Sequence, residues 1–139
     1  MKSLLAKDVL YKSDKEFNLV DASVSHSELL LRSDKIGNED GFNIDIIFSG
    51  VEYLQMPSLL NGLSIYRDSE KKFGYKKVDW MLGKKLASVF NIKSGGDDYY
   101  IVAFDFIVFQ NKLAFGESSL GVIQNKGREK EIARSHKSN

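Results

Sequence analysis

Alternation between apolar and polar residues is the sequence feature that most constrains the fold. In residues 42–49, every even position is apolar, whereas three of the four odd positions are polar. Successive side chains of a strand point to opposite faces, so this segment is predicted to be a strand with one buried face. Residues 17–24 and 28–33 are two further β-like runs, and the Ser-His-Ser sequence between them suggests a hairpin. The fold should therefore be rich in β-structure.

The most apolar segment covers residues 99–109. One set of alternate positions is entirely apolar, and the other contains Asp105 as its only charged member. This pattern predicts one long central strand that is covered on both faces. Apolar residues resume after residues 110–112 and continue to residue 122, which predicts a closing antiparallel hairpin.

Two shorter runs lie between these segments. Residues 51–55 can continue the strand at 42–49 or follow a bulge at Gly50. Residues 63–66 come directly after Asn61-Gly62, a pair typical of tight turns, and are predicted to form the returning strand.

One segment has helical rather than alternating periodicity. Its apolar residues recur at intervals of three and four, which predicts a helix over residues 78–90 with Gly83 as a weak point. With little helical material between the strands, hairpins are favoured over parallel crossovers. The predicted class is α+β, mainly antiparallel β: a single sheet or half-closed barrel of about six or seven strands with one helix packed against it.

The chain has 139 residues, of which 42% are hydrophobic, and this suits one compact domain. We assign residues 1–123 to that domain. Residues 124–139 are almost entirely polar and would bury little apolar surface, so they are predicted to be a flexible tail.

Composition narrows the possible functions. The absence of cysteine excludes disulfides, thiolate metal sites and cysteine nucleophiles, and the two histidines are far apart in sequence, so no metal or other cofactor is expected. No apolar run approaches the roughly 18 residues that a membrane helix needs, and no export signal is visible, so we expect a cytoplasmic protein without a membrane partner.

Catalytic candidates are few. Ser25, His26 and Ser27 lie near acids, but no nucleophile-elbow motif surrounds them, and a turn histidine in solvent is the simpler interpretation. His136 falls in the predicted tail. Asp45 and Asp105 each stand inside an apolar strand, where an unpaired carboxylate would cost several kcal/mol.

These two aspartates leave alternatives open. They could face one concave surface as a general acid and base. Alternatively, their strand face is wet, or each acid is paired with an arginine such as Arg32 or Arg67. We predict that the protein is not an enzyme.

Residues 71–85, KKFGYKKVDWMLGKK, carry the clearest electrostatic signal. Six lysines and a single aspartate surround Phe73, Tyr75 and Trp80, a composition that can contact phosphates while rings stack on bases. Lysine lacks the bidentate fork with which arginine reads bases, and solvated lysines are ordinary. Residues 1–60 contain ten acids and six bases, and residues 61–139 contain nine acids and fourteen bases, so the molecule could be electrically polar.

The segments FNIDIIFSGVEYL and YYIVAFDFIVFQNKLAFGESSLG, in a small chain without cysteine, resemble in general type the bacterial immunity proteins that neutralise toxins. The resemblance implies a protein partner, a toxin domain encoded nearby, whose active site or substrate access would be blocked. Buried aromatics ringed by polar residues often dominate interface energy. The predicted partner-binding residues are Tyr53, Tyr66, Phe73, Tyr75, Lys76, Lys77 and Trp80. The alternative is a nucleic-acid-binding module that uses residues 71–85.

Overall fold

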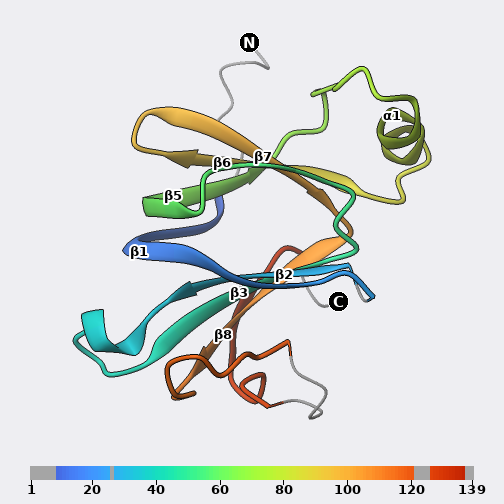
Figure 1. The fold of residues 1–139 in the computed structure, drawn as a ribbon. Coiled ribbons are helices and arrows are strands. Elements are labelled where there is room, and N and C mark those ends of the chain that lie inside the picture. Colours follow the sequence, from blue (N-terminus) through green and yellow to red (C-terminus); the bar gives the residue numbers. More distant parts are fainter. Residues whose placement is uncertain (1–8, 26, 121–125, 137–139) are drawn as a thin grey trace.

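The computed structural model describes residues 9–25, 27–120 and 126–136, and these form one open, bent antiparallel sheet with a single α-helix (Figure 1). The sheet order is β4-β7-β6-β5-β1-β2-β3-β8-β9. The elements are β1 (Val9–Ser23), β2 (Glu28–Ser33), the 3-10 turn η2 (Lys35–Gly37), β3 (Asn43–Ser49), β4 (Tyr53–Gln55), β5 (Leu59–Arg67), α1 (Lys76–Gly83), β6 (Ser88–Ser94), β7 (Asp97–Ala103), β8 (Asp105–Asn111) and β9 (Glu131–Arg134).

The predicted class, mainly antiparallel β with one helix, is confirmed, but the described residues form nine strands rather than six or seven. One reason is that residues 99–109 are not one strand. The chain bends at Phe104, so β7 pairs with β4 and β6 while β8 pairs with β3 and β9. The two apolar halves therefore lie in different parts of the sheet.

The bend at Phe104 faces a second bend, at Gly50, where β3 leads into β4. The Phe104 amide donates to the Ser49 carbonyl at 2.9 Å. Gly50 has φ +66°, and a Cβ there would stand 3.0 Å from the Cβ of Phe104. Only glycine combines this backbone conformation with so close an approach. The two bends fold the sheet so that its halves face each other.

The main core lies between these facing halves. It draws buried aliphatic and aromatic side chains from β1, β2, β3, β5, β6, β7 and β8. At its centre the Phe106 ring lies 5.3 Å from the rings of both Phe48 and Phe90, centroid to centroid. Burial of each such ring contributes about 1.5–3 kcal/mol relative to exposure. The bent sheet is thus held by residues far apart in sequence.

The predicted helix over residues 78–90 is only partly correct. The helix ends at Gly83, and Ser88–Ser94 is strand β6. Val89 packs on the outer face with Val78 and Val102, whereas Phe90 enters the main core. This alternation is that of a strand, because β6 must fill the place between β5 and β7.

Two predicted hairpins are wrong and one is confirmed. Gly62 lies inside β5, which pairs with β1 and β6 and not with the strand before it. No hairpin follows β8, because the described residues 113–120 form turns that cover the sheet. The hairpin of β1 and β2 forms as predicted, with Leu19 opposite Leu31.

Part of the segment predicted to be a flexible tail belongs to the sheet. Residues 131–134 form β9, whose Ala133 lies opposite Val108 of β8 and packs against the main core. Arg128 donates to the Ser119 carbonyl at 2.8 Å and forms an ion pair with Glu28 at 3.1 Å. Gln124, Asn125 and residues 137–139 of that segment lie outside the described residues. No helix among the described ranges is long and apolar enough to cross a membrane.

Candidate functional site

The lysine-rich part of the chain, residues 68–87, covers the outer face of β4, β7 and β6. Aromatic rings hold it there: the Tyr53 ring lies 4.6 Å from that of Phe73 and 5.6 Å from that of Tyr75. Phe73 also meets Tyr100 of β7 edge-on at 5.8 Å. Beneath these rings lie the buried side chains of Val78, Ala87, Val89 and Val102.

Asp79 closes the loop that precedes α1. Its two carboxylate oxygens accept hydrogen bonds from the amides of Phe73, at 3.1 Å, and Gly74, at 3.0 Å. A carboxylate in the first turn also interacts favourably with the positive end of the helix dipole. The chain of residues 73–79 is therefore fixed in place by both ring packing and this carboxylate.

Several large side chains of this region remain in solvent. Tyr75 and Trp80 are 56% and 57% exposed, and Leu86 is exposed as well. We call residues 71–86 the lysine–aromatic segment. Exposed rings that gather in one region, as these do, form the kind of apolar patch that often marks an interaction site.

The lysines of the lysine–aromatic segment differ in their contacts. The Lys71 ammonium lies 4.9 Å from the centre of the Tyr100 ring, and Lys77, mostly exposed, is 3.8 Å from Glu52. The remaining four form no ion pair with a residue of the described ranges: Lys72, Lys76, Lys84 and Lys85. Their charge is directed at solvent.

The structure brings most of the predicted partner-binding residues together. Tyr53 contacts both Phe73 and Tyr75, and Lys76, Lys77 and Trp80 follow on α1. Tyr66 lies apart on β5: it is opposite Asn91, which in turn is opposite Tyr100. The sequence analysis did not include Tyr100 and Leu86 in this surface. Tyr100 is two positions from Val102 on β7, so both side chains lie on the same, outer face of the strand.

Asp45 is part of a buried ionic network on the outer face of β2, β3 and β8. Arg32 binds both of its oxygens, with N–O distances of 2.7 and 2.8 Å, as the pairing alternative proposed. Asn111 and the Ser119 hydroxyl also donate to Asp45, at 2.9 and 2.7 Å. Arg32 in addition donates to the Glu117 carbonyl at 2.6 Å. Every buried side-chain polar atom of the described residues has a hydrogen-bond partner, and this carboxylate receives four donors.

Asp105 does not meet Asp45. It lies opposite Ser49, four positions along β3 from Asp45, at the edge of the same outer face. Burial raises the pKa of the Asp105 carboxyl, an effect that His136 and Arg134 partly offset. His26 lies outside the described residues, and Asp21 accepts a hydrogen bond from the Ser118 hydroxyl. The described ranges contain no cluster of three or more metal-ligating side chains.

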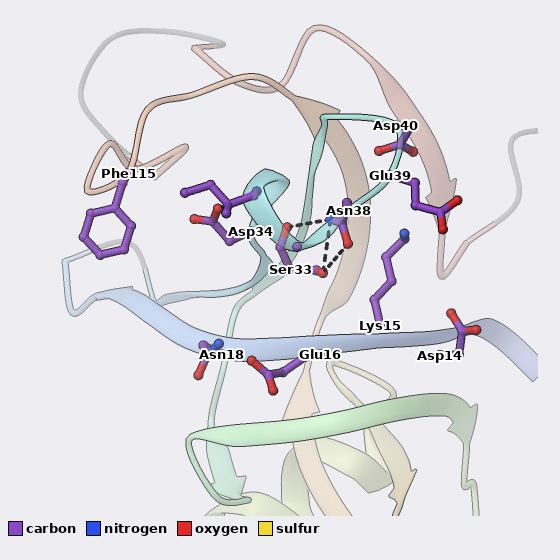
Figure 2. A pocket seen from close by; sticks show the side chains of 12 residues that line it. Asp14, Lys15, Glu16, Asn18, Ser33, Asp34, Asn38, Glu39, Asp40 and Phe115 are labelled. Atoms are coloured by element: carbon purple, nitrogen blue, oxygen red, sulfur yellow. Dashed lines mark hydrogen bonds between the residues drawn. The ribbon is translucent and has the colours of Figure 1, made fainter.

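A groove of about 880 Å³ runs between β1, η2 and the loop at Phe115 (Figure 2). Figure 2 shows acidic side chains on both of its sides, and we call it the acidic groove. Its lining acids are Asp14, Glu16, Asp34, Glu39 and Asp40. Lys15 also lines the groove. Asp34 and Asp40 accept hydrogen bonds from the amides of Ile36 and Phe42. Ile36 and Phe115 are 83% and 87% exposed at its rim.

Comparison with known proteins gives no relative: no family model, no curated protein and no solved structure matches this chain. The candidate surfaces are therefore defined by their own geometry.

Proposed function

We propose that this protein is a non-catalytic binding protein that docks an acidic surface of a protein partner through its lysine–aromatic segment. The immunity proteins that it resembles would do this by occupying a toxin domain. The observation that carries the proposal is the exposure of Tyr75 and Trp80, each more than half in solvent, among six lysines of which only Lys77 has an acidic partner in the described ranges.

The exposed rings favour a protein partner. Tryptophan and tyrosine are enriched among the residues that dominate interface energy, because they bury a large rigid area at little entropic cost. Beneath them, the side chains of Val78, Ala87, Val89 and Val102 are already buried, while more than half of the Tyr75 and Trp80 surface stays exposed. Lysines around such rings would guide an acidic partner during approach and contribute less to the final affinity.

The segment is also prepared for binding before the partner arrives. Tyr53 and Phe73 pack against each other, and Asp79 fixes the loop between them and α1. A surface that is already ordered avoids the cost of ordering side chains and loops on association, about 0.5–1.5 kcal/mol for each immobilised side chain.

A non-catalytic role is supported by the contacts of Asp45, whose carboxylate oxygens accept four hydrogen bonds.

Binding should be tested with the product of the adjacent gene, purified and titrated against the full chain by calorimetry. We expect a stoichiometric complex in which Trp80→Ala lowers affinity about 10- to 100-fold, the loss typical of an interface anchor. Lys76→Glu with Lys77→Glu should mainly slow association. Lys12→Glu with Lys130→Glu, two exposed lysines elsewhere, is the matched control and should change neither.

Two results would contradict this proposal. One is that no adjacent gene product binds the chain or loses activity in its presence. The other is a complex whose affinity is the same for Trp80→Ala as for the unaltered protein, with both folded by circular dichroism.

Nucleic acid is the second candidate partner. The observation in its favour is that the same exposed rings alternate with lysines along one short segment, an arrangement that suits base stacking beside a phosphate backbone. Affinity for a single-stranded oligonucleotide should then fall steeply with salt, and Lys76→Glu with Lys77→Glu should abolish it. Absence of binding at low ionic strength dismisses this candidate.

A further inference from the structure

A pocket of about 390 Å³ is lined in part by the lysine–aromatic segment, through Lys71, Lys72, Leu82 and Lys85. Its other lining residues come from the end of β5, the loop after it, the start of β6 and His136. The proposed partner-binding anchors Tyr75 and Trp80 do not line it. This pocket can therefore be assessed independently of the partner-binding proposal.

Positive charge converges on the pocket from several segments. Its lining residues include Arg67, Lys71, Lys72, Lys85 and His136. The Lys71 ammonium lies over the Tyr100 ring, and a ring nitrogen of His136 lies 3.1 Å from the Phe104 carbonyl, so Lys72 and Lys85 are the cations most open to a ligand. Asp68 is the one acid among the lining residues, and its carboxylate already accepts the amides of Glu70 and Lys71, at 3.0 and 3.2 Å. The pocket thus presents a net positive charge that a small anion can neutralise.

The pocket also offers neutral donors and an apolar wall. The hydroxyls of Ser69 and Ser88 line it, as do the side chains of Leu82, Ala87 and Val89, of which the last two are buried. Serine hydroxyls can donate to an anion at any orientation that they can reach by rotation. The apolar wall can cover the organic part of a ligand, and the volume falls within the range typical of small-molecule sites.

The turn that carries Lys85 is fixed by the end of α1. Lys85 follows the C-cap residue and has φ +59°, in the left-handed region. The Lys85 amide donates to the Leu82 carbonyl at 3.1 Å and the Leu86 amide donates to the Met81 carbonyl at 2.9 Å, which is the Schellman pattern of a helix end. The backbone of Lys85 is therefore held in place at the pocket.

We propose that this pocket binds the terminal phosphate of a small organic phosphate monoester. A phosphate monoester carries close to two negative charges and three acceptor oxygens near neutral pH, so it matches several cations and two hydroxyls at once. Lys72 and Lys85 supply point charges. The Arg67 guanidinium already donates to the Ser135 carbonyl at 3.3 Å and lies over the Phe90 ring, so it adds positive charge near the site rather than a free fork. The organic part lies against Leu82, Ala87 and Val89.

Calorimetric titration of the full chain at low salt tests this site, with AMP, inorganic phosphate and adenosine as probes. We expect saturable one-to-one binding of AMP, weaker binding of phosphate and none of adenosine. Lys72→Gln with Lys85→Gln should weaken AMP binding at least 10-fold. Lys76→Gln with Lys77→Gln removes the same charge outside the pocket and should change it less than 2-fold.

A thymidine oligonucleotide without terminal phosphates separates a monoester site from a backbone site. The proposal is overturned if this oligonucleotide binds the pocket lysines more tightly than AMP does. It is also overturned if neither AMP nor phosphate binds, if adenosine binds as well as AMP, or if both lysine pairs give the same loss. If AMP does not bind but the protein complex forms, only the pocket proposal is contradicted. If AMP binds but no protein complex forms, only the partner-binding proposal is contradicted.

Discussion

The two halves of the bent sheet are each covered on their outer face by a loop segment, but by opposite means. Over β2, β3 and β8, residues 113–120 and 126–130 are held by hydrogen bonds and ion pairs centred on Arg32 and Asp45. Over β4, β7 and β6, residues 68–87 are held by aromatic and aliphatic contacts. The polar covering pairs its charges internally, whereas four lysines of the aromatic covering form no ion pair within the described ranges.

The charge distribution follows this difference. The acidic groove, which η2 borders, lies beside the polar covering, whereas the lysine–aromatic segment, which includes α1, belongs to the aromatic covering. In Figure 1, η2 and α1 stand at opposite ends of the molecule. The fold therefore keeps the acidic side chains of the groove apart from the lysines of the lysine–aromatic segment. A molecule with such charge separation orients itself as a charged partner approaches.

The largest expected effect comes from breaking the polar covering at its centre. Asp45→Ala leaves Arg32 buried without its carboxylate, and this should lower the free energy of unfolding by about 3–5 kcal/mol. Urea denaturation measures the loss. The double variant Asp45→Leu with Arg32→Met removes both charges and should recover much of it. Equal loss in the two proteins would mean that the uncompensated charge is not the cause.

The corresponding change in the aromatic covering should cost less. Tyr53→Ala removes a half-buried ring from contact with Phe73 and Tyr75 and should lower the unfolding free energy by about 2–3 kcal/mol, below the value for a fully buried ring. Tyr53→Phe keeps the ring and is the control. If Tyr53→Ala destabilises the protein more than Asp45→Ala, the ranking of the two coverings is reversed.

Substitution of Gly127 tests the polar covering without removing a charge. Gly127 has φ +81°, its carbonyl accepts from Asn111 at 3.1 Å, and a Cβ there would lie 2.7 Å from Leu113 and 3.1 Å from the Cβ of Ser119. Gly127→Ala should cost about 1–3 kcal/mol through strain and displacement of the loop. Hydrogen exchange should quicken over residues 113–120 and remain unchanged over α1.

The smallest expected effect concerns Asp105, a carboxylate on the polar side without a buried arginine. Because its pKa is raised in the folded protein, ionised Asp105 opposes folding, and stability should increase as pH falls through the folded pKa. Asp105→Asn should therefore raise the melting temperature by about a degree or two at pH 7 after solvent screening. The gain should vanish near pH 3. An Asp105→Asn variant less stable at pH 7 than the wild type would contradict this sign.

The sequence predicted the residues that face the core better than the way in which strands pair. Alternation identified β3 correctly, because each of its even positions from Ile44 to Phe48 enters the main core. It could not show that the odd positions are buried too, since the covering loop comes from residues far along the chain. The bend at Phe104 was hidden because an apolar residue continues the pattern of a strand through the break.

The candidate site could be anticipated in part for similar reasons. Phe73, Tyr75 and Trp80 are close in sequence, so composition alone revealed them together. The contact of Phe73 and Tyr75 with Tyr53 depends on β4 pairing with β7, which no local pattern indicates. The pocket lined by Arg67, Lys85 and His136 draws on three distant parts of the chain and left no signal in the sequence.

The polar covering joins partners that are remote along the chain, and this bears on how quickly the protein reaches its native state. Asn43 and Asn111 are separated by 68 positions, and Glu28 and Arg128 by 100. Proteins dominated by such distant pairings fold over milliseconds to seconds, because long loops must close before contacts reward them. During synthesis, Glu28 and Arg32 cannot form their contacts with residues 117–128 until that segment has left the ribosome. A ribosome-bound intermediate should therefore expose the outer face of β2, β3 and β8 to chaperones.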